Sequence, residues 1–281
     1  MSTSFTASSQ SSDSIAALAF MAYGVRVRME SEDPTVLEDL RERLPPGSTP
    51  WPSRQVDRSY TVTLNEGGVA TDAGRRYSLW SDGERLHGDC NGGQVREMLE
   101  VHSRLFMAEH APHHVFVHAG VVGWGSTAIM VLGRSLAGKT TLVAELIKRG
   151  ARYYSDEYAV LDRNGYVHPY MKPLSIRQEG RYEQQDFSVE ELGGRPGKKP
   201  LLVEFILACS YQAGARWQPH RLTSGEAVLE LLANAVSARR QPEQVLGVLE
   251  KVAVRATTLK GVRGESNELL DEFLDIKQNR T

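Results

Sequence analysis

Cysteine is scarce in this sequence, and so are long apolar runs and any excess of charge of one sign. The 281 residues contain two cysteines, Cys90 and Cys209, which lie far apart and in no spacing typical of a metal or redox site. We therefore expect reduced thiols in a cytoplasmic protein and no disulfide scaffold. The net charge of −2 gives no reason to expect nucleic acid or an anionic membrane as a partner.

Segments that could cross a membrane are missing from the sequence as well. No run of about 18 apolar residues occurs, so we expect no membrane span. Residues 1–14 are rich in Ser and Thr and carry no basic stretch, and the apolar run Ile15–Val25 follows Asp13 without a small-residue cleavage pattern. These features predict a disordered tail that leads into a first strand, and not a signal peptide.

The composition, 41% hydrophobic and 24% charged, is typical of a globular protein with one large or two modest domains. The first third alternates apolar and polar residues as half-buried strands do, and two stretches have helical spacing. The expected strands are 22–29, 59–64 and 76–81, and the expected helices begin at Pro34 and span 92–110. We therefore expect a small α+β module at 15–111, after the tail at 1–14.

From residue 112 onward the sequence is denser in β-branched residues, as in strands that are buried on both faces. The expected strands are 114–122, 127–132, 152–155, 159–162 and 201–209, with a hairpin-type turn at Asn164-Gly165. The expected helices are 140–149, 224–238 with Ser224 as N-cap, 242–252 and 266–276. Strands followed by helices in this way predict an α/β domain at 112–281.

The residues Gly133–Thr140 have the pattern G-x-x-x-x-G-K-T of a phosphate-binding loop. Glycines allow successive backbone N–H groups to wrap a phosphate, Lys139 brings a positive charge to the β- and γ-phosphates, and the Thr140 hydroxyl ligates Mg²⁺. The helix that follows directs its positive dipole end at the anion. The sequence therefore predicts binding of ATP with Mg²⁺. The residues expected to contact this cofactor are Gly133, Arg134, Ser135, Leu136, Ala137, Gly138, Lys139, Thr140 and Thr141.

An acidic pair, Asp156-Glu157, lies at the end of the expected strand after the loop, 17 residues beyond Lys139. If the two strands are neighbours, the pair emerges at the same sheet edge as the loop, where ligands bind in open α/β sheets. One carboxylate there can hold Mg²⁺, and the other can accept a proton from an attacking hydroxyl. His118 lies in a strand upstream of the loop, where a histidine is more often a core residue than a catalytic one.

The stretch His118–Asp162 resembles the catalytic domain of HPr kinase/phosphorylase and related proteins. The resemblance rests on HAGVV, GRSLAGKTTL and ELIKRGARYYSDE, and covers about 45 residues strongly. It implies a P-loop nucleotide-binding domain of the HPr kinase/phosphoenolpyruvate carboxykinase type. By residue, it implies phosphate and metal binding by Lys139 and Thr140, a metal-holding role for Asp156, the general-base position for Glu157, and a place near the nucleotide for His118.

Two features depart from the family. The family's loop ends G-K-S-E, whereas this one ends Gly138-Lys139-Thr140-Thr141. The family's Gly/Arg-rich catalytic loop is not apparent, and its nearest counterparts are Gly193-Gly194-Arg195 and Lys198-Lys199. Both departures count against HPr itself as the substrate and against a reverse phosphorolysis.

Three functions remain open on the sequence. The first is an ATP/Mg²⁺-dependent serine kinase-like phosphotransferase acting on a hydroxyl of a peptide or protein; the others are a small-molecule kinase and a nucleotide-binding regulatory protein with little turnover. An ABC-type ATPase and a GTPase are disfavoured, because neither L-S-G-G-Q nor N-K-x-D occurs. The family's tendency to form hexamers makes a homo-oligomer an expectation by analogy alone.

Overall fold

In this computed structural model the described residues are 15–65, 74–133, 138–177 and 184–278. Within them the chain is mixed α/β, and no helix there is long and apolar enough to cross a membrane. The chain divides into two compact units, Met1–Phe106 and Met107–Thr281. The division falls inside helix α2 (Gly92–His110), a few residues before the boundary expected from the change in sequence character.

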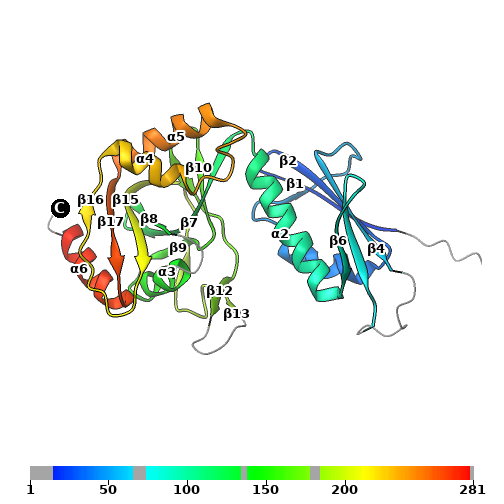
Figure 1. Cartoon of the computed structure of the whole chain (residues 1–281), viewed down its shortest axis with the longest axis horizontal. Coiled ribbons are helices and arrows are strands. Elements are labelled where there is room, and N and C mark those ends of the chain that lie inside the picture. Colours follow the sequence, from blue (N-terminus) through cyan, green and yellow to red (C-terminus); the bar gives the residue numbers. More distant parts are fainter. Residues whose placement is uncertain (1–14, 66–73, 134–137, 178–183, 279–281) are drawn as a thin grey trace, which may run out of the picture. The chain divides into compact units, whose positions relative to one another are not determined.

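The first unit is a six-stranded sheet in the order β3-β1-β2-β4-β5-β6, with the helices α1 and α2 (Figure 1). Its strands are β1 (Ala16–Ala22), β2 (Val25–Ser31), β3 (Thr49–Pro50), β4 (Arg58–Leu64), β5 (Tyr77–Ser81) and β6 (Glu84–Cys90). Its helices are α1 (Pro34–Glu38), the 3-10 helix η1 (Asp39–Arg43) and α2. Alternate residues of β2 are buried, as the alternation over 22–29 predicted, and β1 shows the same pattern from Leu18 onward.

Two hairpins in this unit differ from the expectation. The strand expected at 22–29 is interrupted by a turn at Tyr23-Gly24, where φ is 51° and 83°, and β1 and β2 pair antiparallel on either side. Strand β6 was not expected at all, although Asp82-Gly83, with φ of 47° and 87°, joins it to β5. Both turns need two consecutive residues at positive φ, which Asp-Gly adopts readily and Tyr-Gly rarely does.

The second unit is built on a nine-stranded mixed sheet. The strands of the unit are β7 (His114–Trp124), β8 (Thr127–Leu132), β9 (Arg152–Ser155), β10 (Tyr158–Asp162), β11 (Tyr166–His168), β12 (Leu174–Arg177), β13 (Gln184–Phe187), β14 (Arg195–Pro196), β15 (Leu201–Tyr211), β16 (His220–Arg221) and β17 (Thr257–Arg263). Its helices are α3 (Lys139–Lys148), α4 (Ser224–Leu232), α5 (Pro242–Arg255) and α6 (Ser266–Gln278). The hairpin β12–β13 forms a separate two-stranded sheet.

Helices cover both faces of this large sheet (Figure 1). One core cluster joins the sheet to α4 and α5 through fully buried residues such as Leu231 and Leu249. The other joins the opposite face to α3 and α6 through Leu142, Leu146 and Phe273. The unit is therefore a three-layer α/β/α arrangement, in agreement with the expected α/β class.

The order of strands brings the carboxyl ends of β8, β15 and β17 to the same end of the sheet. Strand β7 pairs antiparallel with both β8 and β9, so β8 and β9 run in the same direction although they are not neighbours. On its other side β8 pairs parallel with β15, and β15 pairs parallel with β17. After β8 and β17 the chain leaves the sheet at the same end, where open α/β sheets bind ligands. After β9 it continues along β7 as β10, and the backbone N–H of Ala119 donates to the carbonyl oxygen of Glu157 in the short break between the two strands. Ala119 also pairs with Leu132, so this break lies beside the end of β8.

Two details of the C-terminal region correct the expectation. Strand β17 was not expected, because the run Thr257–Arg263 stands between helical segments. Helix α4 ends at Leu232 and not near residue 238, and its N-cap is Thr223 instead of Ser224. Thr223 and Glu226 form a reciprocal capping box, which satisfies two backbone donors at once. This arrangement stabilises the helix start more than the single cap that Ser224 would provide.

Candidate functional site

The phosphate-binding loop joins β8 to α3, as the sequence predicts. Of its residues, Arg134, Ser135, Leu136 and Ala137 lie outside the described part of the chain. Gly138 is the N-cap of α3 with φ of 74°, a conformation that glycine adopts without strain. Lys139 is buried and its Nζ donates a hydrogen bond of 2.9 Å to the carbonyl oxygen of Gly133, so the lysine spans the two ends of the loop.

Gly120 explains how α3 comes close enough to β7 to present the loop. A Cβ at this position would lie 2.6 Å from Cγ2 of Val143, a fully buried residue of α3. Only a residue without a side chain permits this approach. The glycine of the His118-Ala-Gly segment thus positions the helix whose N-terminus follows the phosphate-binding loop.

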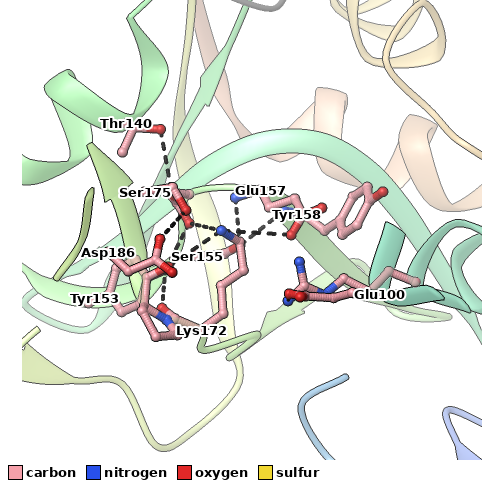
Figure 2. Close-up of polar contacts among 12 residues, drawn as sticks. Glu100, Thr140, Tyr153, Ser155, Glu157, Tyr158, Lys172, Ser175 and Asp186 are labelled. Atoms are coloured by element: carbon pink, nitrogen blue, oxygen red, sulfur yellow. Dashed lines mark hydrogen bonds and ion pairs between the residues drawn. The ribbon is translucent and has the colours of Figure 1, made fainter. Parts of the chain in front are cut away.

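Thr140, which Figure 2 labels, contacts Asp156, although the two residues are 16 positions apart in the chain. The Thr140 hydroxyl donates to Oδ2 of Asp156 over 3.2 Å. The Tyr153 hydroxyl lies 3.0 Å from Oδ1 of the same carboxylate, which is 4% exposed. Burial, with the charge of Asp156 next, raises the pKa of Tyr153, so this phenol remains a hydrogen-bond donor at neutral pH.

The distance between these two oxygens is close to that between neighbouring ligands of Mg²⁺. Two neighbouring ligands of an octahedral Mg²⁺ at about 2.0–2.1 Å lie about 2.9 Å apart, close to the Thr140–Asp156 distance of 3.2 Å. Magnesium at nucleotide sites uses one or two protein oxygens and takes its other ligands from phosphates and water. The described residues contain no group of three or more His, Cys, Asp or Glu side chains that could hold a metal ion.

Glu157 lies beside Asp156 in the turn between β9 and β10, with its side chain 23% exposed. Its backbone N–H donates to the Ser155 hydroxyl, and that hydroxyl also accepts from Tyr158 N–H, so a side chain fixes the turn that presents the pair (Figure 2). Lys172 lies 3.3 Å from Oδ1 of Asp156 and 3.9 Å from Oε2 of Glu157. Glu157 is therefore the more accessible carboxylate of the two.

His118 lies in the middle of β7, opposite Tyr158 of β10 in the register, and the two rings are in edge contact. Burial, followed by the positive charge of Lys139, lowers the pKa of His118 to about 4; Asp156 opposes this shift, and Lys172 adds a smaller lowering. The imidazole is thus neutral at physiological pH. The imidazole of His118 is close enough to the charges of Lys139, Asp156 and Lys172 to be affected by them. His118 therefore lies among the expected site residues.

The structure adds Arg263, which the sequence analysis missed. It ends β17, is 3% exposed, and donates through Nη2 to the carbonyl oxygen of Gly138 over 3.2 Å. Burial lowers the pKa of its guanidinium. A position at the carboxyl end of a strand is a sequence signal for a site residue. Arg263 could be found by that signal only if Thr257–Arg263 had been recognised as a strand.

Lys172 was missed as well. It lies between β11 and β12 in a segment with no recognisable motif, His168-Pro-Tyr-Met-Lys-Pro173. Its place beside Asp156 depends on how that segment returns to the sheet edge, and no local pattern encodes such a return.

The other residues expected at the site are less closely connected to Lys139, Thr140 and Asp156. Thr141 is exposed on the first turn of α3. Arg195 begins β14, which pairs parallel with β9, and Gly194 directly precedes it. A Cβ at Gly194 would meet Ile147, and one at Gly197 would meet the ring of Tyr154. The described contacts of these glycines are thus structural.

A cavity of about 810 Å³ lies at the carboxyl ends of β8, β15 and β17, with α4 forming one wall. Its apolar lining includes Leu132, Ala208 and Val262. Its polar lining includes Glu230 and Lys260, which form an ion pair. Because Gly133 also lines it, the cavity borders the first residue of the phosphate-binding loop, on the β15 side of β8 and away from β9 and the acidic pair.

No protein-family model matches this chain, and no curated protein matches it significantly.

Proposed function

We propose that this chain is an ATP- and Mg²⁺-dependent phosphotransferase, similar to HPr kinase, that phosphorylates a hydroxyl, of Ser by preference, on a peptide or protein. The observation that carries the proposal is the meeting of Thr140 and Asp156, 3.2 Å apart, directly after a loop of the G-x-x-x-x-G-K-T pattern. A phosphate-binding loop followed by a metal-binding hydroxyl and carboxylate is the common apparatus of phosphoryl transfer.

The nucleotide would lie across the end of β8. Its phosphates would be held by the loop and by Lys139, which would exchange the Gly133 carbonyl for phosphate oxygens. Arg263, already at Gly138, would add a second fixed positive charge where negative charge develops. The 810 Å³ cavity beside Gly133 would accept the nucleoside, since the acidic pair lies on the opposite side of β8.

Bound Mg²⁺, held by Thr140 and Asp156, would neutralise charge on the phosphates. Glu157 would accept the proton of the attacking hydroxyl, because it is the more exposed of the two carboxylates and lies next to the metal-binding one. In this transfer the hydroxyl oxygen would form a bond to the γ-phosphorus, and the bond from that phosphorus to the β–γ bridging oxygen would break. ADP would leave, and Glu157 would keep the proton, so every atom of the reaction is accounted for.

Two features support a peptide or protein as the acceptor. The resemblance to HPr kinase implies a protein serine. In the first unit, β6 pairs only with β5 among the described residues, and Glu84, Arg85 and Leu86 on it are exposed. Such an edge can bind an extended peptide as an added strand through main-chain hydrogen bonds.

The test is a transfer assay with two pools of acceptors. The full chain is incubated with Mg²⁺ and ATP labelled at the γ-phosphate, with serine-containing peptides in one pool and small hydroxylated metabolites in the other, and products are identified by mass spectrometry. We expect labelled phosphoserine from wild type and almost none from Glu157→Gln. Label only in the small-molecule pool would replace this proposal by a small-molecule kinase. Nucleotide binding without any transfer would favour the regulatory alternative.

A further inference from the structure

Lys172 occupies a position that the proposed chemistry does not require. Its Nζ lies 3.3 Å from Asp156 and 3.9 Å from Glu157, and its side chain is 13% exposed (Figure 2). An ammonium group therefore sits within ion-pair distance of both carboxylates that the proposed function assigns to metal and proton. A surface lysine would gain little from such a pair, but a nearly buried one is screened far less by water.

The fold holds this lysine in place. The Tyr153 hydroxyl lies 2.9 Å from the carbonyl oxygen of Lys172 and 3.0 Å from Asp156, so one phenol joins the lysine's backbone to the carboxylate. Two residues earlier, Tyr170 N–H donates to the carbonyl oxygen of Tyr154, and the fully buried Tyr170 ring packs edge-on against Phe116. The segment that carries Lys172 is thus fixed to both β7 and β9.

The two oxygens of the Asp156 carboxylate face different partners. Oδ2 faces the Thr140 hydroxyl and Oδ1 faces Lys172. A metal ion shared by Thr140 and Asp156 would therefore bind on the Oδ2 side, with a positive ammonium on the other oxygen of the same group. The two cations would repel each other across a buried carboxylate, where the effective dielectric constant is low.

The net charge of the site determines which form of the metal ion it favours. Lys139 and Lys172 carry two positive charges, and Asp156 and Glu157 carry two negative ones, so these four side chains sum to zero, and Arg263 beside Gly138 stands outside this sum. A bare divalent cation would bring the sum to +2. A metal–ATP complex brings a net charge of about −2, and Arg263 at Gly138 offsets part of that.

We propose that Lys172 makes the site selective for the metal–nucleotide complex over the free metal ion: it neutralises the acidic pair and thereby keeps a divalent cation from binding until the phosphates bring compensating charge. The inference rests on the proposed function for its nucleotide, but its effect on free metal is separate. Lys172 acts here as a positioning and charge-balancing residue and makes no contact with the acceptor.

The experiment measures binding of Mn²⁺ alone to the nucleotide-free full chain, by calorimetry or by the electron paramagnetic resonance signal of free Mn²⁺. Lys172→Met keeps the length of the side chain and removes its charge. We expect it to bind free Mn²⁺ at least about tenfold more tightly than wild type, a coupling of ordinary size for two nearby ligands. Lys148→Met is the matched control, because Lys148 is an exposed lysine of α3 paired with Glu145, and it should bind Mn²⁺ as wild type does.

Two further variants complete the design. Lys172→Arg retains the charge and should keep the weak affinity of wild type for free Mn²⁺, while the double variant Lys172→Met/Asp156→Asn should lose the gain. Equal Mn²⁺ affinity in wild type, Lys172→Met and Lys172→Gln would overturn the inference; Lys172→Gln serves also if the Met variant does not fold. A parallel titration with Mn²⁺–ATP separates the two proposals, because its failure would count against the nucleotide site alone.

Discussion

Asp156 and Glu157 are adjacent in the chain but differ in their surroundings. Asp156 is 4% exposed and is contacted by Thr140, Tyr153 and Lys172, whereas Glu157 is 23% exposed. We expect Asp156→Asn to impair metal-dependent nucleotide binding and turnover together. Glu157→Gln should leave nucleotide binding nearly unchanged and lower the rate of transfer by about 10²–10⁴, the usual contribution of a positioned general base.

Equilibrium titrations with Mg²⁺–ADP and single-turnover transfer assays separate these effects. A Glu157→Gln variant that turns over like wild type would assign the base to another group or to water. A loss of nucleotide affinity in Glu157→Gln as large as in Asp156→Asn would instead make the pair a joint metal site.

Asp33 is the corresponding buried carboxylate of the first unit. Its two oxygens accept from Thr35, Arg75 and Tyr77, and it caps α1. Burial alone would raise the pKa of Asp33, but the hydrogen bonds from Tyr77, Thr35 and Arg75 outweigh it and lower the pKa to about 2. Asp33→Ala should cost about 3 kcal/mol in the free energy of unfolding, since it leaves buried partners unsatisfied.

The sign of the pH dependence follows from that shift. The folded state holds Asp33 ionised below the unfolded pKa of about 4, so its contribution is complete above about pH 4 and is lost as the pH falls through 2. Urea unfolding of wild type and Asp33→Ala should therefore give curves that differ near neutral pH and converge towards pH 2. The exposed Asp39→Ala should change the free energy of unfolding by no more than about 0.5 kcal/mol. A constant difference at every pH would contradict the assignment.

Single residues were predictable where a local motif carries the chemistry and not elsewhere. The G-x-x-x-x-G-K-T pattern singled out Gly138, Lys139 and Thr140 because the proposed roles depend on consecutive backbone geometry, and these residues lie at the start of α3, the helix that follows β8. Arg263 reaches the same loop from 125 residues away, and Lys172 reaches Asp156 from 16 residues away. Neither belongs to a pattern, because only the packing of the sheet edge brings them to the site.

At the scale of elements, the contact between β7 and α3 positions the phosphate-binding loop. Gly120→Ala would place a Cβ 2.6 Å from Val143, and crowding of this kind in a packed core costs about 1–3 kcal/mol. We expect a lower free energy of unfolding and weaker nucleotide binding, because α3 must move. The double variant Gly120→Ala/Val143→Ala should recover part of both.

The matched control is Gly247→Ala in α5, where a new Cβ meets nothing within 4 Å and helix propensity favours alanine. It should be neutral or stabilising. If Gly120→Ala is as harmless as Gly247→Ala, the close approach of α3 to β7 does not constrain the loop.

Elements with strong periodicity were predicted well. The bounds of α2, β8 and β9 agree with the expectation, and those of α3 differ by one residue. Prediction failed where two elements meet without a clear break. The Tyr23-Gly24 turn interrupts a continuous alternation of apolar and polar residues. Strand β17, which has only seven residues, lies between two helices. Pairing with a distant strand, β15, stabilises β17, and a local pattern carries no information about that pairing.

At the scale of the whole molecule, the second unit has the features of an independent domain. Both of its core clusters consist of residues beyond position 107, and all residues of the proposed nucleotide site lie there too. A fragment of residues 107–281 should therefore unfold cooperatively and bind Mg²⁺–ATP with an affinity close to that of the full chain. If the first unit recruits the acceptor, the fragment should hydrolyse ATP slowly but fail to phosphorylate a peptide.

Circular dichroism melts, nucleotide titrations and the transfer assay, run on fragment and full chain side by side, give the answer. Transfer to peptide by the fragment at the rate of the full chain would remove the first unit from substrate recognition. An unfolded fragment would mean that the two units depend on each other for stability.

Nucleotide binding at the loop Gly133–Thr140 is the central claim, and a titration with Mg²⁺–ATP tests it directly. Wild type is compared with Lys139→Ala and with Lys148→Ala, which removes an exposed lysine from the other end of the same helix. Loss of a charge-assisted phosphate contact should weaken binding by about 1.5–3 kcal/mol, or roughly 10–150-fold, in Lys139→Ala alone. Equal affinity in all three proteins would contradict the account.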